Sequence, residues 1–153
     1  MLEWESVSDA VEGDLYRELY EGLPGPIPDL GREGSRPTPV GVVAAREAGK
    51  LMGWAEVYAS ETKGGAAVLQ WLLIERERRR ISSGFNTEHP GSPAEIELLS
   101  ALASQAADRA REAGCTTLRW WPAEPGFAEG VAASLGAEQV VDAEGWRSYR
   151  LHL

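Results

Sequence analysis

Apolar residues recur along the chain with two different periods, and the switches between them mark the predicted elements. The alternating segment 2–7 favours a short first strand. Val11, Leu15 and Leu19 then recur every four residues, which is the spacing of one face of a helix that ends near Gly22. We therefore expect the chain to begin with a strand followed by a helix.

Three strands are predicted in the middle of the chain. Val40 to Ala45 and Leu51 to Ala59 are apolar runs joined by the turn sequence Glu47 to Lys50, which predicts a hairpin. A third run, Ala66 to Ile74, is largely apolar on both faces, as expected for a strand in the covered middle of a sheet. Together these strands would form a meander.

A long amphipathic helix is predicted next, and its start carries the clearest local signal in the chain. Ser92 suits the N-cap, Pro93 the first helical position, and Glu95 closes a capping box. Gly114 ends the helix. The stripe expected to be buried consists of Ile96, Leu99, Leu102, Ala103, Ala106, Ala110 and Ala113.

The remaining chain alternates again between strand and helix. Thr116 to Trp121 favours a strand, and a helix from about Gly126 to Leu135 stops at Gly136. Gln139 to Val141 and Trp146 to Leu151 predict a final pair of strands. The predicted order is strand, helix, three strands, helix, strand, helix and two strands, which indicates an α/β domain.

Length and charge narrow the classes of function. At 153 residues the chain fits a single domain spanning residues 1–153. Its formal net charge of −9 opposes binding to nucleic acid or an anionic membrane, and it attracts basic substrates such as amines. No leader pattern and no apolar run of about 18 residues is found, so we expect neither secretion nor membrane insertion. Cys115 is the only cysteine, which favours a cytoplasmic location, and no ligand spacing suggests a metal site.

Two further expectations concern Cys115 and the tryptophan pair. Cys115 follows a helix-ending glycine and enters a strand, so we expect a buried structural thiol. Alternation along a strand sends Trp120 and Trp121 to opposite faces of the sheet. One ring is therefore expected in the core, and the other is free to line a cleft.

The predicted order resembles the GNAT superfamily of acetyltransferases over most of the chain. Ala110 to Leu118 resembles the family's central helix passing through a glycine into the next strand, and Ala128 to Ala137 resembles the following helix with its terminal Leu-Gly step. The resemblance implies an α+β fold with a mixed, mainly antiparallel central sheet flanked by helices. It also implies that an acetyl or related acyl group passes from acetyl-CoA to an amine of a small molecule or peptide.

The family holds the pyrophosphate of its cofactor in a glycine-rich loop at the start of the long helix, through backbone N–H groups and the helix dipole. Alignment by the helix start places Pro90, Pro93 and Glu95 at the three motif positions. A second alignment matches Arg79 and Gly84 but leaves a longer stretch before the helix. The motif is thus degenerate in one alignment and lengthened in the other.

The resemblance places the cofactor-binding residues around this loop. Backbone N–H groups near Leu73 and Ile74 would polarise the thioester carbonyl. Arg79 and Arg80 belong to a basic cluster that would bind phosphate oxygens, and the alternative is a solvated loop partly neutralised by its glutamates. The remaining cofactor-binding candidates are Gly84, Gly91 and Ser92.

Glu75 and Glu56 are the candidate catalytic residues, as general bases that accept a proton from the amine. Glu75 is the first choice by location, although carboxylates at strand ends are more often surface residues. The family's tyrosine acid aligns with Ala132, so the leaving thiolate would need another acid or solvent.

Two other functions stay open. In the first, the domain has lost acetyl-CoA binding and serves as a non-catalytic binding or interaction module. In the second, it keeps the cleft but catalyses different chemistry on a small metabolite. The final strand could in addition pair across a homodimer.

Overall fold

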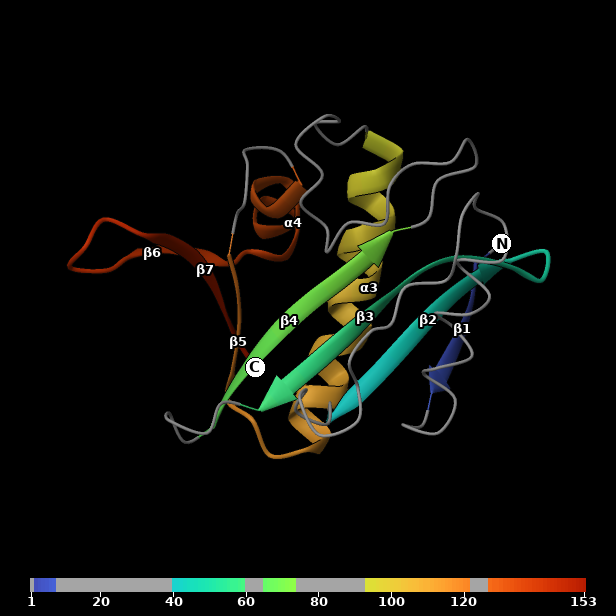
Figure 1. Ribbon diagram of the computed structural model, residues 1–153, viewed down its shortest axis with the longest axis horizontal. Helices are drawn as coiled ribbons and strands as arrows, with labels where there is room; N and C mark the ends of the chain where they lie inside the picture. Colours follow the sequence, from blue (N-terminus) through green and yellow to red (C-terminus); the bar gives the residue numbers. More distant parts are fainter. Residues whose placement is uncertain (1, 8–39, 60–64, 74–92, 122–126) are drawn as a thin grey trace, which may run out of the picture.

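The computed structural model describes residues 2–7, 40–59, 65–73, 93–121 and 127–153, and these form a seven-stranded sheet with two helices (Figure 1). The predicted first helix lies outside these residues. The strands are β1 (Leu2–Val7), β2 (Gly41–Glu47), β3 (Lys50–Ala59), β4 (Ala66–Leu73), β5 (Thr117–Trp120), β6 (Glu138–Val141) and β7 (Arg147–His152), and the helices are α3 (Pro93–Glu112) and α4 (Phe127–Leu135).

The sheet is mixed and mainly antiparallel, with the order β1-β2-β3-β4-β5-β7-β6. β4 and β5 run parallel because the chain crosses from one to the other through α3. All the other neighbouring strands pair in antiparallel fashion. The predicted fold class is therefore confirmed.

The core lies between one face of the sheet, which we call the helix face, and the helix α3. Leu99 and Leu102 of α3 are fully buried against Val57, Leu69 and neighbouring strand residues. Burial of this apolar surface is the main favourable term holding α3 in place. From the predicted stripe, Leu99, Leu102, Ala103, Ala106 and Ala110 are confirmed as buried.

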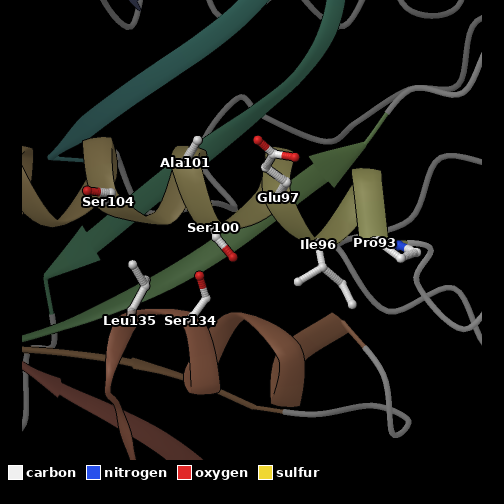
Figure 2. Close-up of a pocket in the computed structure, with 8 residues that line it drawn as sticks. All are labelled: Pro93, Ile96, Glu97, Ser100, Ala101, Ser104, Ser134 and Leu135. Atoms are coloured by element: carbon white, nitrogen blue, oxygen red, sulfur yellow. The ribbon is translucent and has the colours of Figure 1, made fainter.

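Four positions in or next to α3 differ from the predicted stripe, and one of them is Ala107, which is buried although the stripe omits it. Ala113 is exposed because the helix ends at Glu112, and Ile96 is only half-buried near the helix start. Ser100, which the apolar pattern omits, is buried because it faces α4 (Figure 2). A second helix therefore covers a side of α3 that the apolar stripe alone does not reveal.

Both helices end in the same hydrogen-bonded motif. Gly114 has φ 86°, and the Cys115 N–H donates to the Ala110 carbonyl at 2.9 Å. Gly136 has φ 73°, and the residue after it donates to the Ala132 carbonyl at 2.9 Å. A left-handed residue of this kind is favourable for glycine because it has no Cβ. Both predicted stop signals are thus confirmed.

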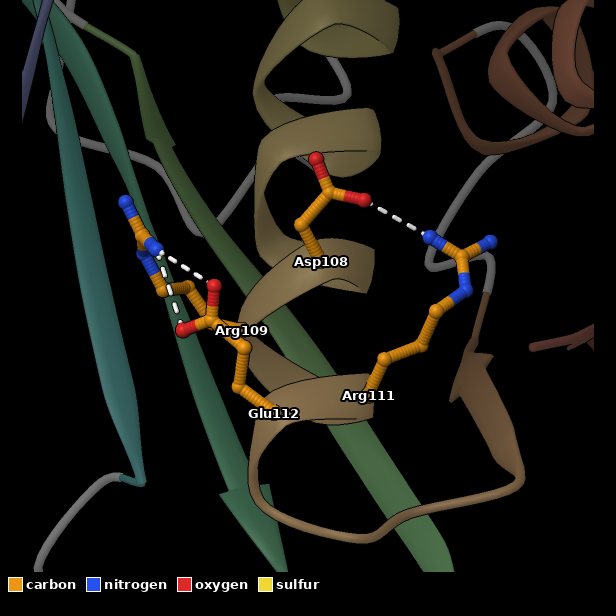
Figure 3. Close-up of polar contacts among 4 residues, drawn as sticks. All are labelled: Asp108, Arg109, Arg111 and Glu112. Carbon is orange, nitrogen blue, oxygen red and sulfur yellow. Dashed lines mark hydrogen bonds and ion pairs between the residues drawn. The ribbon is translucent and has the colours of Figure 1, made fainter.

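Two side-chain ion pairs lie on the last turns of α3 (Figure 3). Arg111 donates to Asp108 at 2.7 Å, and Arg109 donates to both Glu112 oxygens at 3.1 Å. These pairs are spaced three residues apart and are largely exposed. Exposed pairs of this spacing each contribute only about 0.2 to 0.5 kcal/mol, so α3 depends on its buried face.

Candidate functional site

β4 and β5 separate from one another soon after they begin. They pair at only three positions, from Ala66 opposite Thr117 to Val68 opposite Arg119. β4 continues to Leu73 and stays paired with β3 up to that residue. We call the region between 69–73 of β4 and Trp120, the last residue of β5, with the following Trp121, the β4–β5 fork, and Figure 1 shows the two strands diverging there.

Hydrogen bonds hold the closed end of the fork together. The backbone N–H groups of Thr116 and Thr117 both donate to the Gly65 carbonyl, at 2.6 and 3.2 Å. The Leu153 N–H donates to the Thr116 carbonyl at 2.9 Å. The strands are thus fixed at one end, and beyond Val68 the β5-facing backbone edge of β4 has no strand partner in the described parts of the chain. Such an edge can hydrogen-bond to an extended ligand.

A groove of about 640 Å³ lies between the first half of α3 and the end of α4 (Figure 2). Ser100 lines it, and its buried hydroxyl makes no hydrogen bond to any residue that the structure describes. Glu97 is the charged residue on its lining, so the groove walls repel phosphate groups. The groove suits an uncharged ligand segment better than a pyrophosphate.

Glu56 lies on the far face of the sheet, opposite the helix face, in the middle of β3. It is 1% exposed, and its Oε2 accepts a hydrogen bond from the Tyr58 hydroxyl at 2.8 Å. Glu56 is therefore a buried carboxylate, and the alternative of a surface residue does not apply to it. Its position is flanked by Val42 of β2 and Gln70 of β4, so it lies in the interior of the sheet and not at an edge.

Arg119 also projects from the far face, at the last paired position before the fork. Its Nη2 donates to the Ser148 hydroxyl at 2.8 Å, and its guanidinium lies 5.5 Å from the ring centroid of Trp121. Trp121 is 42% exposed, whereas Trp120 on the helix face is fully buried. The opposite orientation of the two tryptophans is as predicted. Arg119, Ser148 and Trp121 thus form one cluster on the far face beside the fork.

Tyr149 is a buried phenol on the helix face beside the end of β5. It is paired in register with Trp120, and the two ring centroids are 6.2 Å apart. Burial raises the pKa of Tyr149 above its ordinary value, the charge of Glu129 on α4 adds to the rise, and Arg147 opposes it. Tyr149 is therefore a protonated, uncharged phenol at neutral pH.

No protein-family model and no curated protein matches the sequence. Among solved structures, the GNAT domain of S. lividans PAT is similar, with a TM-score of 0.63, 14% identity, and coverage of 99% of this chain and 90% of its own. The chain has the GNAT fold. A Salmonella typhimurium protein thought to be an acetyltransferase, solved with its cofactor acetyl-CoA, gives a TM-score of 0.57 at 12% identity and covers 99% and 94% of the two chains. The aminoglycoside acetyltransferase AAC(6′)-Ib with coenzyme A gives 0.56 at 16% identity, with 99% and 95% covered.

Within this GNAT fold, the predicted site residues are only partly placed. Leu73 is the last residue of β4, opposite Gly53, and so lies at the open end of the fork. Glu56 lies one strand further, on β3. The other candidates lie outside the described residues: Ile74, Glu75, Arg79, Arg80, Gly84, Gly91 and Ser92.

Sequence reasoning overlooked three polar residues near the fork, namely Arg119, Ser148 and Tyr149. The alternation in Leu118 to Trp121 signals that Arg119 faces away from the core. Its partner Ser148 is 29 residues away, and no local pattern reveals that pairing. The same holds for Tyr149, whose position depends on the register between β5 and β7.

Two kinds of feature are not found in the part of the chain that the structure describes. None of its helices is long and apolar enough to cross a membrane. No group of three or more His, Cys, Asp or Glu side chains there is arranged to hold a metal ion. Cys115, expected to be buried, is only partly so, and it packs at the margin of the core.

Proposed function

We propose that this protein is an N-acyltransferase that transfers an acetyl or related acyl group from acetyl-CoA to an amine of a small molecule or peptide. The β4–β5 fork carries this proposal. A strand that leaves its parallel neighbour after three paired residues offers backbone groups without a described strand partner to an extended, amide-containing chain such as pantetheine. Two proteins that share the fold hold acetyl-CoA or coenzyme A, and one of them is named for acetylating aminoglycosides, which are amines.

The cofactor would lie with its thioester at the open end of the fork. We propose that backbone N–H groups near Leu73 and Ile74 polarise the thioester carbonyl. The groove between α3 and α4 has no basic residue on its lining, so the phosphates need cations from elsewhere. Arg79 and Arg80 are our candidates for that role. Gly84, Gly91 and Ser92 would allow the backbone to approach the phosphates.

Glu56 and Glu75 are the candidate bases for the attacking amine. Glu56 is supported by its burial near the fork and by the Tyr58 hydrogen bond, which fixes its carboxylate. Tyr149 is our candidate acid for the leaving thiolate, because Ala132, where the family's tyrosine aligns, has no proton to give and is buried. Its neutral phenol lies beside the last residue of β5. The base and the acid would then lie on opposite faces of the sheet.

The proposal is tested by thermal unfolding with and without acetyl-CoA. At a concentration of 100 times Kd a ligand of the native state adds about 2.7 kcal/mol, which for a domain of this size raises Tm by roughly 5 to 10 °C. Arg79→Ala/Arg80→Ala should abolish most of the rise. Arg147→Ala, at an exposed position of β7, is the matched control and should leave it unchanged.

Catalysis is tested separately by acetylation of a panel of amines. Glu56→Gln and Tyr149→Phe should lower kcat while the acetyl-CoA-induced rise in Tm persists. Glu138→Gln, on the exposed strand β6, is the control. A protein that no CoA thioester stabilises would not be an acyltransferase, and the binding-module function would then be the better account. That rival is favoured by Pro93, which lacks a backbone N–H at the helix start.

A further inference from the structure

Arg119 differs in its environment from most of the arginines that the structure describes. Arg46, Arg109, Arg111 and Arg150 each form an ion pair with a carboxylate at 2.7 to 3.1 Å. Arg119 instead contacts a hydroxyl and an aromatic ring, and in the described parts of the chain no carboxylate lies within ion-pair distance of it. Its Nε is buried and has no hydrogen-bond partner there. A partly buried cation without a counterion is costly unless an anion binds to it.

The neighbouring residues that the structure describes do not supply that anion. Arg150 is directly opposite Arg119 on β7, so the residue nearest in register carries the same charge. Glu138 pairs with Arg150 at 2.7 Å and with His152 at 2.8 Å, so its charge is already shared. Two arginines therefore stand side by side on the far face with a single described carboxylate near them. Counted over the described residues alone, the local balance leaves one positive charge without a partner.

The contacts of Arg119 place this charge beside the fork. Trp121 lies two residues further along the chain, directly after β5 and beyond the last residue that pairs with β4, so the guanidinium extends toward the open end. Ser148 holds it from the other side. Glu56 lies on the same far face, on β3, with β4 and the fork in between. Strand spacing puts the two positions about 10 Å or more apart.

We infer that Arg119 binds a carboxylate of the acceptor, so that the substrate is an amine that also carries a carboxylate. This inference rests on the proposed function, because it places the amine near Glu56 and the carboxylate at Arg119 while the acyl donor occupies the fork. Trp121 covers one side of the guanidinium and Ser148 fixes its plane, which leaves the remaining N–H groups for a carboxylate. Arg119 is then a specificity-determining residue.

The test compares matched acid and amide acceptors. ε-Aminocaproate and ε-aminocaproamide have the same amine and chain length and differ in the anionic end; the protein amino acids and their carboxamides extend the series. Binding of each to the coenzyme A-loaded protein is measured by calorimetry, and acetylation by kcat/KM. We expect the acid forms to be preferred, and Arg119→Gln to remove on the order of 10- to 100-fold of that preference, mainly through KM.

Controls separate this role from a structural one. Arg150→Gln removes a neighbouring cation that is already paired and should leave the preference for acids within about twofold. Arg119→Lys keeps the positive charge but loses the planar set of N–H donors, so part of the preference for acids should remain. It replaces Arg119→Gln in the test if the glutamine variant does not fold. If Arg119 had only a structural role, its substitution would change binding and kcat/KM by the same factor for acid and amide acceptors.

Two results would overturn the inference. One is a wild-type protein that binds acids and amides equally well in every pair. The other is an Arg150→Gln variant that loses the preference as fully as Arg119→Gln. Failure of the proposed function looks different, because acetyl-CoA would then leave the Tm of the wild-type protein unchanged before any acceptor is added.

Discussion

The close approach of α4 to α3 at Gly130 allows a sharp test of how the two helices pack. A Cβ added to Gly130 would lie 2.8 Å from Cδ1 and 3.0 Å from Cγ2 of Ile96. Replacing glycine by alanine inside a helix gains about 1 kcal/mol in propensity. Overpacking a contact costs about 1 to 3 kcal/mol, and Ile96 is β-branched and therefore stiff. We expect Gly130→Ala to destabilise the protein by up to about 2 kcal/mol, because overpacking exceeds propensity.

The background Ile96→Ala separates these two terms. Both of the atoms that the new Cβ would meet most closely belong to the Ile96 side chain, so truncation removes the clash. In that background Gly130→Ala should stabilise by about 1 kcal/mol, which gives a coupling of roughly 1 to 3 kcal/mol between the two positions. Each kcal/mol corresponds to about 2 to 4 °C in Tm for a domain of this size.

Urea unfolding followed by far-UV circular dichroism measures all four proteins of this cycle. Ala133→Gly, at an exposed position of the same helix, is the control, and it should lose about 1 kcal/mol in both backgrounds. The reasoning is refuted if Gly130→Ala stabilises the wild-type background as much as the Ile96→Ala background. In that case Ile96 does not set the distance between α3 and α4.

Two further predictions concern polar contacts. Tyr58→Phe removes the hydroxyl that donates to the buried Glu56, so the free energy of unfolding measured in urea should fall by about 1 to 3 kcal/mol; an unchanged value would mean that Glu56 finds another donor. The hydrogen bonds from Arg150 and His152 hold the pKa of Glu138 below its ordinary value of 4.5, so NMR titration should show this pKa rising in Arg150→Gln. Because the folded-state pKa is lowered, the stabilising contribution of Glu138 is complete above pH 4.5 and is lost as the pH falls through the folded-state pKa. A wild-type Glu138 that titrates at the ordinary value of 4.5 would contradict this prediction.

Local pattern was enough to predict most of the secondary structure. The capping box before Ile96 and the glycine at 114 bracket α3 to within two residues, because a helix start and stop depend on nearby side chains and backbone. The turn at 47–50 was equally readable, with Ala48 and Gly49 both at positive φ. Ala113 was misplaced because periodicity continues through a helix end and cannot by itself locate it.

The candidate site was much less predictable than the fold. The pairing of Val68 with Arg119 joins residues that are far apart in sequence. The β4–β5 pairing stops there and the fork begins, but no sequence pattern in either strand predicts this point. Burial of Glu56 likewise depends on how the sheet is covered rather than on its own strand. Charge balance around Arg119 becomes visible only when β5 and β7 are in register.

The short junction between β4 and β5 also bears on the order in which the sheet assembles. The hairpins on either side of it close over short loops, whereas the Gly65 and Thr116 contact at the junction spans 51 residues. Loop-closure entropy makes such a contact form after the local ones, and three paired positions give it little to resist opening. The sheet therefore consists of two halves, β1–β4 and β5–β7, that α3 joins, and the seam between them has only three paired positions. A ligand lying along that seam would bind both halves, and it would stabilise the whole domain rather than one loop.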